Sequence, residues 1–215
     1  MARNKYPEET VERILDVSLD LFIRNGYENT SIQDIIDNLG GLTKGAIYHH
    51  FKSKEKILEA VANKIYSSTE EKVKSIMKDS SLNGLEKLRK LFQSSIENPN
   101  QEKFFTASPM LLNNPSLLAM QLKDSIEIIA PNYIQPIIEE GIKDGSIKTD
   151  YPKELAEVML ILSNIWLNPL VYSVSTQDMI NKIKFYDVFL KGMGINVFDE
   201  SMYDKLVELD NLSKR

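Results

Sequence analysis

LTKGAIYHHFKSKEKIL, residues 42–58, contains the start signals of two successive helices. Thr43 is a residue type that caps helix N-termini, so the sequence predicts a short helix over 44–50. Ser53 is the expected N-cap of a long helix over 54–78. Within this stretch four lysines stand against one glutamate, although the 215-residue chain carries a net charge of −5. A surface that attracts phosphate must therefore be small and local.

The residues before this stretch predict two more helices. Apolar residues recur at helical spacing over 8–25, and Gly26 is a typical helix end. Thr30 and Gln33 fit the N-cap and N3 positions of a capping box, and the helix that they start would end at the glycine pair 40–41. Two short helices joined by a glycine-containing turn are the elements of a helix-turn-helix, which places its second helix in the major groove of DNA.

The remainder of the chain predicts longer helices and no strand. Apolar periodicity and proline punctuation place these helices near 82–97, 101–111, 115–129, 132–144, 152–174, 176–192 and 199–212. The change from short to long helices indicates a boundary near residues 50–55. We therefore expect an all-α protein, with an N-terminal three-helix helix-turn-helix domain over 1–53 and a larger helical domain over 54–215.

Composition argues against several other classes of protein. The chain contains no cysteine, which removes disulfides and thiol catalysis and fits a reducing cytoplasm. Its two histidines are adjacent, and Ala46 and Ile47 stand three positions before them, so the Glu-x-x-His pairs of a di-iron bundle are missing. We see no secretory signal, no membrane span, no metal site and no catalytic constellation. The sequence therefore predicts a cytoplasmic protein that is not an enzyme and needs no cofactor.

Residues 8–62 also carry a family resemblance. NGYENTSIQDIIDNLGGLTKGAIYHHFKSKEKIL, residues 25–58, resembles the N-terminal signature of the TetR family of bacterial transcriptional repressors. The turn at 40–42 is one residue longer than the usual family pattern. The resemblance implies a homodimer that binds a palindromic DNA operator and a C-terminal domain that binds a small molecule and dimerises. Ligand binding would then shift the fourth helix and release the DNA.

The resemblance also implies roles for single residues. Four of them match positions that commonly face bases: Gln33, Thr43, Lys44 and Ala46. Tyr48, His49 and Lys54 match positions that commonly meet the DNA backbone. Lys52 can also reach phosphate, and Gly45 lets the helix approach closely.

Several of these residues have a second interpretation. Gln33 can equally complete the capping box with Thr30, and Thr43 can serve as N-cap and phosphate neighbour together. The ring of Tyr48 can pack in the small core instead of presenting its hydroxyl to phosphate. Of the two histidines, we expect His49 to point outward and its neighbour to pack back.

The second domain offers a candidate ligand pocket and a candidate dimer face. Large side chains with a few polar groups are typical of pockets, although plain core packing explains each one alone. The candidate pocket residues are Phe104, Phe105, Met110, Met120, Tyr133, Trp166, Asn168 and Tyr172. The resemblance implies dimerisation through the helices at 152–174 and 176–192, with apolar faces that include Leu155, Val158, Met159, Leu162, Phe185, Val188 and Phe189.

The effector is expected to be lipophilic or aromatic. Two alternatives remain open at this point: a DNA-binding regulator without a small-molecule effector, and a helical enzyme of unknown type.

Overall fold

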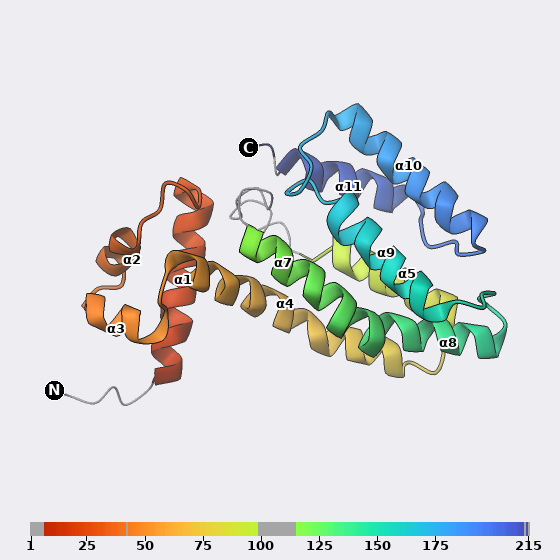
Figure 1. Cartoon of the computed structure of the whole chain (residues 1–215), viewed down its shortest axis with the longest axis horizontal. Coiled ribbons are helices and arrows are strands. Elements are labelled where there is room, and N and C mark those ends of the chain that lie inside the picture. The colour runs from red at the N-terminus through yellow and green to blue at the C-terminus, as the bar shows by residue number, and fades with distance from the viewer. Residues whose placement is uncertain (1–6, 42, 99–114, 213, 215) are drawn as a thin grey trace.

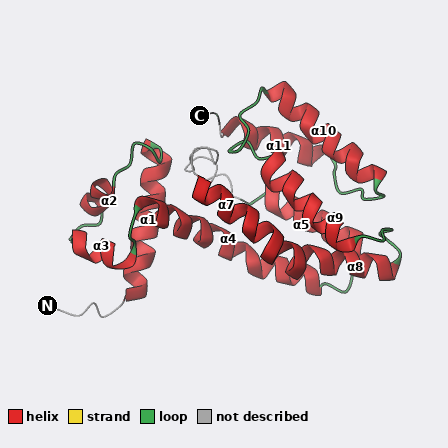
Figure 2. Cartoon of the chain, viewed as in Figure 1, coloured by secondary structure: helices red, strands yellow, loops and turns green. Residues whose placement is uncertain are grey.

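A computed structural model describes residues 7–41, 43–98, 115–212 and 214. Within these ranges every regular element is a helix, which confirms the all-α expectation (Figure 2). Three helices, α1, α2 and α3, gather around the start of the long helix α4, while the remaining helices form a larger body (Figure 1). In the described part of the chain, no helix has the length and apolar content needed to cross a membrane.

The first four helices lie close to their predicted positions. Their bounds are α1 Pro7–Asn25, α2 Ile32–Asn38, α3 Lys44–His50 and α4 Lys54–Lys78. The core of this N-terminal unit consists of fully buried aliphatic and aromatic side chains from all four helices, among them Ile14, Phe22, Ile35, Leu39, Ile47 and Ile57. Thr43 and Ser53 cap α3 and α4, as predicted from residue type.

The cap of α2 differs from the prediction. Ser31 is the N-cap, and its hydroxyl accepts a hydrogen bond from the amide of Asp34, whose carboxylate accepts one from the Ser31 amide in return. Thr30 is instead buried, and its hydroxyl donates to the carbonyl of Gly26 at 2.9 Å. The expected capping box of Thr30 with Gln33 is therefore wrong by one residue. An aspartate three residues after a serine satisfies the same two backbone amides.

The larger body begins with α5, Gly84–Ile96, and continues after the undescribed residues 99–114. The expected helix at 101–111 lies outside the described residues. The other helical elements are α7 Pro115–Asp124, η2 Ser125–Ile134, α8 Gln135–Asp144, α9 Pro152–Ile161, η3 Leu162–Trp166, α10 Thr176–Gly192 and α11 Glu200–Leu212.

Two predicted helices of the body have a different form. The segment from 115 to 144 is one continuous run in which η2, a wider π-helical stretch, joins α7 to α8. Pro131 lies inside η2 and has no amide hydrogen to donate, so a regular α-helical ladder is interrupted there.

The predicted helix 152–174 ends early, because η3 is followed by Leu167 and a turn. In this turn the buried Asn168 side chain accepts the Leu170 amide at 2.9 Å. Pro169 disfavours helical geometry at the residue before it, which explains the early end.

Candidate nucleic-acid interface

Helix α3 is held by one buried face, and this leaves its opposite face in solvent. Ile47 is fully buried, and Phe51, which ends the helix, is also in the core. Lys44 and Tyr48 stand one helical turn apart on an exposed face, with the Lys44 ammonium 5.9 Å from the centre of the Tyr48 ring. The Tyr48 side chain is 42% exposed, so its ring does not pack in the core.

The two histidines separate as expected from their adjacent positions. His49 is exposed, whereas His50 is half-buried in a shallow hollow whose other lining residues come from α1: Glu8, Val11 and Glu12. Gly45 and Thr43 are exposed at the start of α3, and Ala46 is half-buried. The first turn of α3 therefore presents small side chains and one lysine, which allows its backbone to come close to another surface.

Gln33 lies exposed on α2. Its amide donates to the carboxylate of Asp37 at 2.8 Å, one turn further along the helix. It has no part in the helix cap, which Ser31 and Asp34 form. The capping interpretation of Gln33 is therefore wrong.

At the start of α4 one lysine is exposed and the next is held by a contact within the chain. The hydroxyl of Ser53 accepts the Lys56 amide at 3.3 Å, and Lys52 is exposed beside it. The Lys54 ammonium donates to the carbonyl of Tyr27 at 2.8 Å and lies 4.2 Å from the centre of the Tyr27 ring. Lys54 therefore fastens the turn between α1 and α2 to α4, a role that the sequence analysis did not anticipate.

Comparison with known proteins agrees with this architecture. A model of bacterial regulatory proteins of the TetR family matches residues 14–61, and a model of the C-terminal domain of tetracycline repressor-like proteins matches residues 100–188. The two matches together cover more than half of the chain. The chain belongs to the TetR family. Members of this family are DNA-binding transcriptional regulators and not enzymes.

Two curated relatives illustrate how far the similarity extends. The transcriptional repressor KstR2 of Mycolicibacterium smegmatis is 27% identical over 154 residues, which cover 69% of this chain and 73% of that protein. The transcriptional repressor DhaR of Mycobacterium sp. strain GP1 is 27% identical over 170 residues, covering 76% of this chain and 80% of that protein. Both alignments extend well beyond the N-terminal unit into the C-terminal domain.

Two solved structures support the fold. A TetR-family regulator from Pectobacterium atrosepticum aligns with a TM-score of 0.64 at 22% identity, covering 89% of this chain and 97% of that one. Salmonella enterica GusR aligns with a TM-score of 0.58 at 22% identity and covers both chains completely.

The described residues of the candidate ligand pocket lie on several different elements. Trp166 and Tyr172 flank the Lys182 ammonium, which lies 5.1 Å and 4.6 Å from their ring centres. Asn168 holds the turn after η3, and the Tyr133 hydroxyl donates to Glu70 on α4. Met120 is half-buried on α7. Phe104, Phe105 and Met110 lie outside the described residues.

Sequence reasoning missed a set of partly buried polar residues in the C-terminal domain of this TetR-family protein. The Asn164 amide donates to the hydroxyl of Ser125 at 3.3 Å, and Gln121 donates to the Asn164 carbonyl at 3.2 Å. These residues link α7 and η2 to η3, and Ser125 is fully buried. Scattered neutral polar residues give no sequence signal of this kind, because nothing in their spacing distinguishes them from helix-surface residues. Over the stretches that the structure describes, no group of three or more histidine, aspartate or glutamate side chains is placed to hold a metal ion.

The residues of the candidate dimer face divide into exposed and buried ones. Phe185 and Val188 on α10 are 59% and 66% exposed, and Val158 on α9 is also exposed. Leu155 and Met159 are buried in the core of the chain itself, so they are not available to a partner. They point inward because α9 packs along η2 and α8 with that side of the helix.

Proposed function

We propose that this TetR-family protein is a repressor that binds a palindromic operator as a homodimer and is released by a small molecule bound in its C-terminal domain. The observation that carries this proposal is the division of α3 into a buried face pinned by Ile47 and an exposed face that presents Lys44 and Tyr48. A helix held in this way can enter a major groove without disturbing the core. DNA binding would take place in the cytoplasm.

The proposed contacts follow the exposed positions of the helix-turn-helix. Lys44 and Gln33 have long polar side chains in solvent and can reach base edges, together with the smaller residues Thr43 and Ala46. Gly45 adds no side chain to the approaching surface. This set gives the interface its proposed sequence preference.

Phosphate contacts would surround this reading surface. We assign them to the Tyr48 hydroxyl, His49 and Lys52, which are exposed, and to Lys54 at the amide end of α4. Because the Lys54 ammonium also donates to Tyr27, its contribution to phosphate binding would be smaller than that of Lys44.

Homodimerisation is supported by the apolar surface of α9 and α10. Val158, Phe185 and Val188 expose aliphatic or aromatic side chains that a two-fold related copy would cover with the same surface. Their large exposure is costly in water and favours burial on association. Dimerisation would fix the separation of the two copies of α3, which must match two half-sites about 34 Å apart.

The effector is proposed to be lipophilic or aromatic. It would act by changing the separation of the two reading heads, which are the helix-turn-helix units of the two subunits. The part-buried hydrogen bonds that join Gln121, Asn164 and the buried Ser125 involve only neutral groups, which agrees with an effector that carries little charge. Such coupling between effector and operator is typically about 1–3 kcal/mol.

The proposal is tested by selecting an operator from random duplex DNA and measuring its retention in a gel at several salt concentrations. Lys44→Ala is expected to lower affinity by about tenfold or more and to relax sequence preference at its base pair. Tyr48→Ala should weaken binding to all sequences alike. Lys143→Ala, an exposed lysine on α8, is the matched control for loss of one charge.

Two results would contradict the assignment. If Lys44→Ala and Tyr48→Ala both bind the selected operator like the unmodified chain, the reading surface lies elsewhere. If the chain selects no preferred duplex from the pool, the proposed operator function itself is refuted.

A further inference from the structure

The described buried side chains of the long helix α4 lie near its two ends. Near its start Leu58, Val61 and Ala62 are buried against the N-terminal unit, and near its end Ile76 is buried in the body. Between Ala62 and Ile76 none of the side chains that the structure describes is buried. In this middle part Glu70 accepts an exposed hydrogen bond from Tyr133 of η2, and the half-buried side chain of Val73 packs against the core.

The first end moves with the reading head. Lys64 forms ion pairs with Glu12 and Asp16 of α1 at 2.6 and 2.8 Å. Together with the buried residues of the first turns, these pairs make the start of α4 part of the helix-turn-helix unit. The described buried contact of α4 with the body, at Ile76, lies at its other end.

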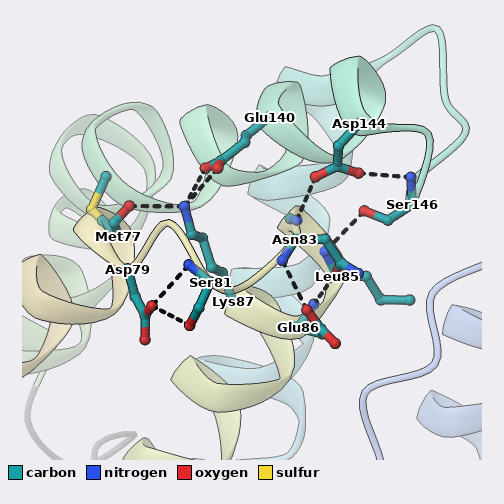
Figure 3. Close-up of polar contacts among 11 residues, drawn as sticks. Met77, Asp79, Ser81, Asn83, Leu85, Glu86, Lys87, Glu140, Asp144 and Ser146 are labelled. Atoms are coloured by element: carbon teal, nitrogen blue, oxygen red, sulfur yellow. Dashed lines mark hydrogen bonds and ion pairs between the residues drawn. The ribbon is translucent and has the colours of Figure 1, made fainter.

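At that end a buried lysine joins three helices (Figure 3). The side chain of Lys87 on α5 is only 3% exposed. Its ammonium donates to the carbonyl of Met77, in the last turn of α4, at 3.0 Å, and to both carboxylate oxygens of Glu140 on α8 at 2.6 and 2.7 Å. Three acceptors satisfy the three hydrogens of the ammonium, which is what a buried lysine requires.

The same junction brings the backbones of α5 and α8 into contact. A Cβ atom built on Gly84 would lie 2.3 Å from the backbone nitrogen of Gly141. The Gly84 amide donates to the carboxylate of Asp144 at 2.8 Å, and the Leu85 amide donates to the Ser146 hydroxyl at 3.2 Å (Figure 3). The start of α5 is thus locked onto the end of α8, and Lys87 extends that lock to α4.

We propose that Lys87 and Glu140 are positioning residues for DNA binding: they hold the last turn of α4 as a fixed pivot, and so set the direction in which each reading head points. This inference rests on the proposed function. Its physical basis is the length of the lever. The 25 residues of α4 span about 37 Å, so a rotation of about 5° at the pivot would displace the start of α4 by about 3 Å.

A displacement of this size is large for a base-reading helix, whose contacts need positions held to about 0.5 Å. Loss of the pivot would therefore widen the range of half-site spacings to which the dimer can bind. Contacts inside each half-site would be preserved, because the helix-turn-helix moves as a unit.

The test uses Lys87→Met, which keeps length and removes the charge, and Glu140→Gln, which keeps shape and weakens the acceptor. Glu139→Gln removes the neighbouring carboxylate of α8 and is the control, since Glu139 is bonded to Gln135 of its own helix. Circular dichroism first establishes that each variant is folded.

The first measurement is the distance between reading head and body within one chain. Because the chain has no cysteine, Glu28→Cys and Asp204→Cys introduce two unique, exposed sites for spin labels. Labelled chains are diluted with unlabelled ones so that distances within a chain dominate. We expect Lys87→Met and Glu140→Gln to widen or shift the distribution by about 3 Å, and Glu139→Gln to leave it unchanged. An unchanged distribution in folded Lys87→Met overturns the proposal.

The second measurement compares affinity for the selected operator with affinity for versions whose half-sites are moved by one base pair. We expect both variants to lose discrimination among spacings by about five- to tenfold, a change within the range of typical coupling between sites. Equal weakening at every spacing, or altered distances without altered spacing preference, would show a merely structural role and overturn the proposal. If the unmodified chain selects no operator, the proposed function fails, whereas the label distances still decide whether Lys87 fixes α4.

Discussion

Replacement of Gly84 by alanine tests the close backbone approach of α5 and α8. The added Cβ would lie 2.3 Å from the Gly141 nitrogen, 2.4 Å from its Cα and 2.7 Å from the Ile137 carbonyl oxygen. All three atoms belong to the backbone of α8, so no side-chain rotation can relieve the overlap. To restore ordinary contact at about 3.4 Å, α5 must withdraw from α8 by about 1 Å.

This withdrawal loosens the packing of α5 over the region that carries the buried residues Leu88 and Leu91. Overpacking of a well-filled core typically costs about 1–3 kcal/mol, and an obstacle made of backbone belongs at the upper end of that range. Alanine recovers at most about 1 kcal/mol through its better helix propensity, and less in the first turn. We therefore expect Gly84→Ala to lower the free energy of unfolding by about 2 kcal/mol.

Urea unfolding followed by circular dichroism, at one fixed protein concentration, measures the change. Gly192→Ala is the matched control, because Gly192 is the last residue of α10 and a Cβ there meets nothing within 4 Å. The control should be neutral or stabilising by up to about 1 kcal/mol. A loss below about 0.5 kcal/mol for Gly84→Ala, the range of ordinary surface substitutions, would refute the close approach of α5 and α8.

Three further outcomes are expected. Phe185→Glu should convert the dimer into monomers in sedimentation experiments, because it places a charge on the proposed α10 interface; an unchanged dimer would move the interface away from Phe185. Ser31→Ala should cost about 1 kcal/mol of unfolding free energy in urea through loss of the α2 cap, and an unaltered urea midpoint would argue against that cap. Hydrogen bonds from the Ser146 hydroxyl and the Gly84 amide hold the pKa of Asp144 below its usual range, so the stability that it contributes is present above its unfolded-state pKa and is lost as pH falls through the lowered value. The urea midpoint should therefore drop less between pH 5 and about pH 3 in Asp144→Asn than in the unmodified chain, and equal drops would contradict the link.

The N-terminal unit was predictable because its signals are local. A cap residue, a run of apolar positions and a glycine stop all lie in or beside one helix. The starts of α3 and α4 follow directly from their cap residues, Thr43 and Ser53. The one-residue error at Thr30 arose where two hydroxyl residues stand side by side. Which of them caps α2 depends on whether Thr30 can be buried beneath α1, and this is a tertiary contact.

Long-range contacts explain what the sequence did not reveal about the site. Lys54 has the residue type and position of a phosphate ligand, yet its ammonium is held by Tyr27, 27 residues earlier in the chain.

In the sequence Lys87 resembles any solvated lysine on an amphipathic helix. Its carboxylate partner Glu140 lies on α8, more than 50 residues later in the chain, and the Lys87 side chain is buried only in the folded structure. The apolar pattern of α5 indicates which side of that helix faces the core. The carboxylate that pairs with the lysine on that side belongs to another segment of the chain. Residues that set the direction of α4 are for this reason absent from any motif of the reading head, although the spacing of the two heads would depend on them.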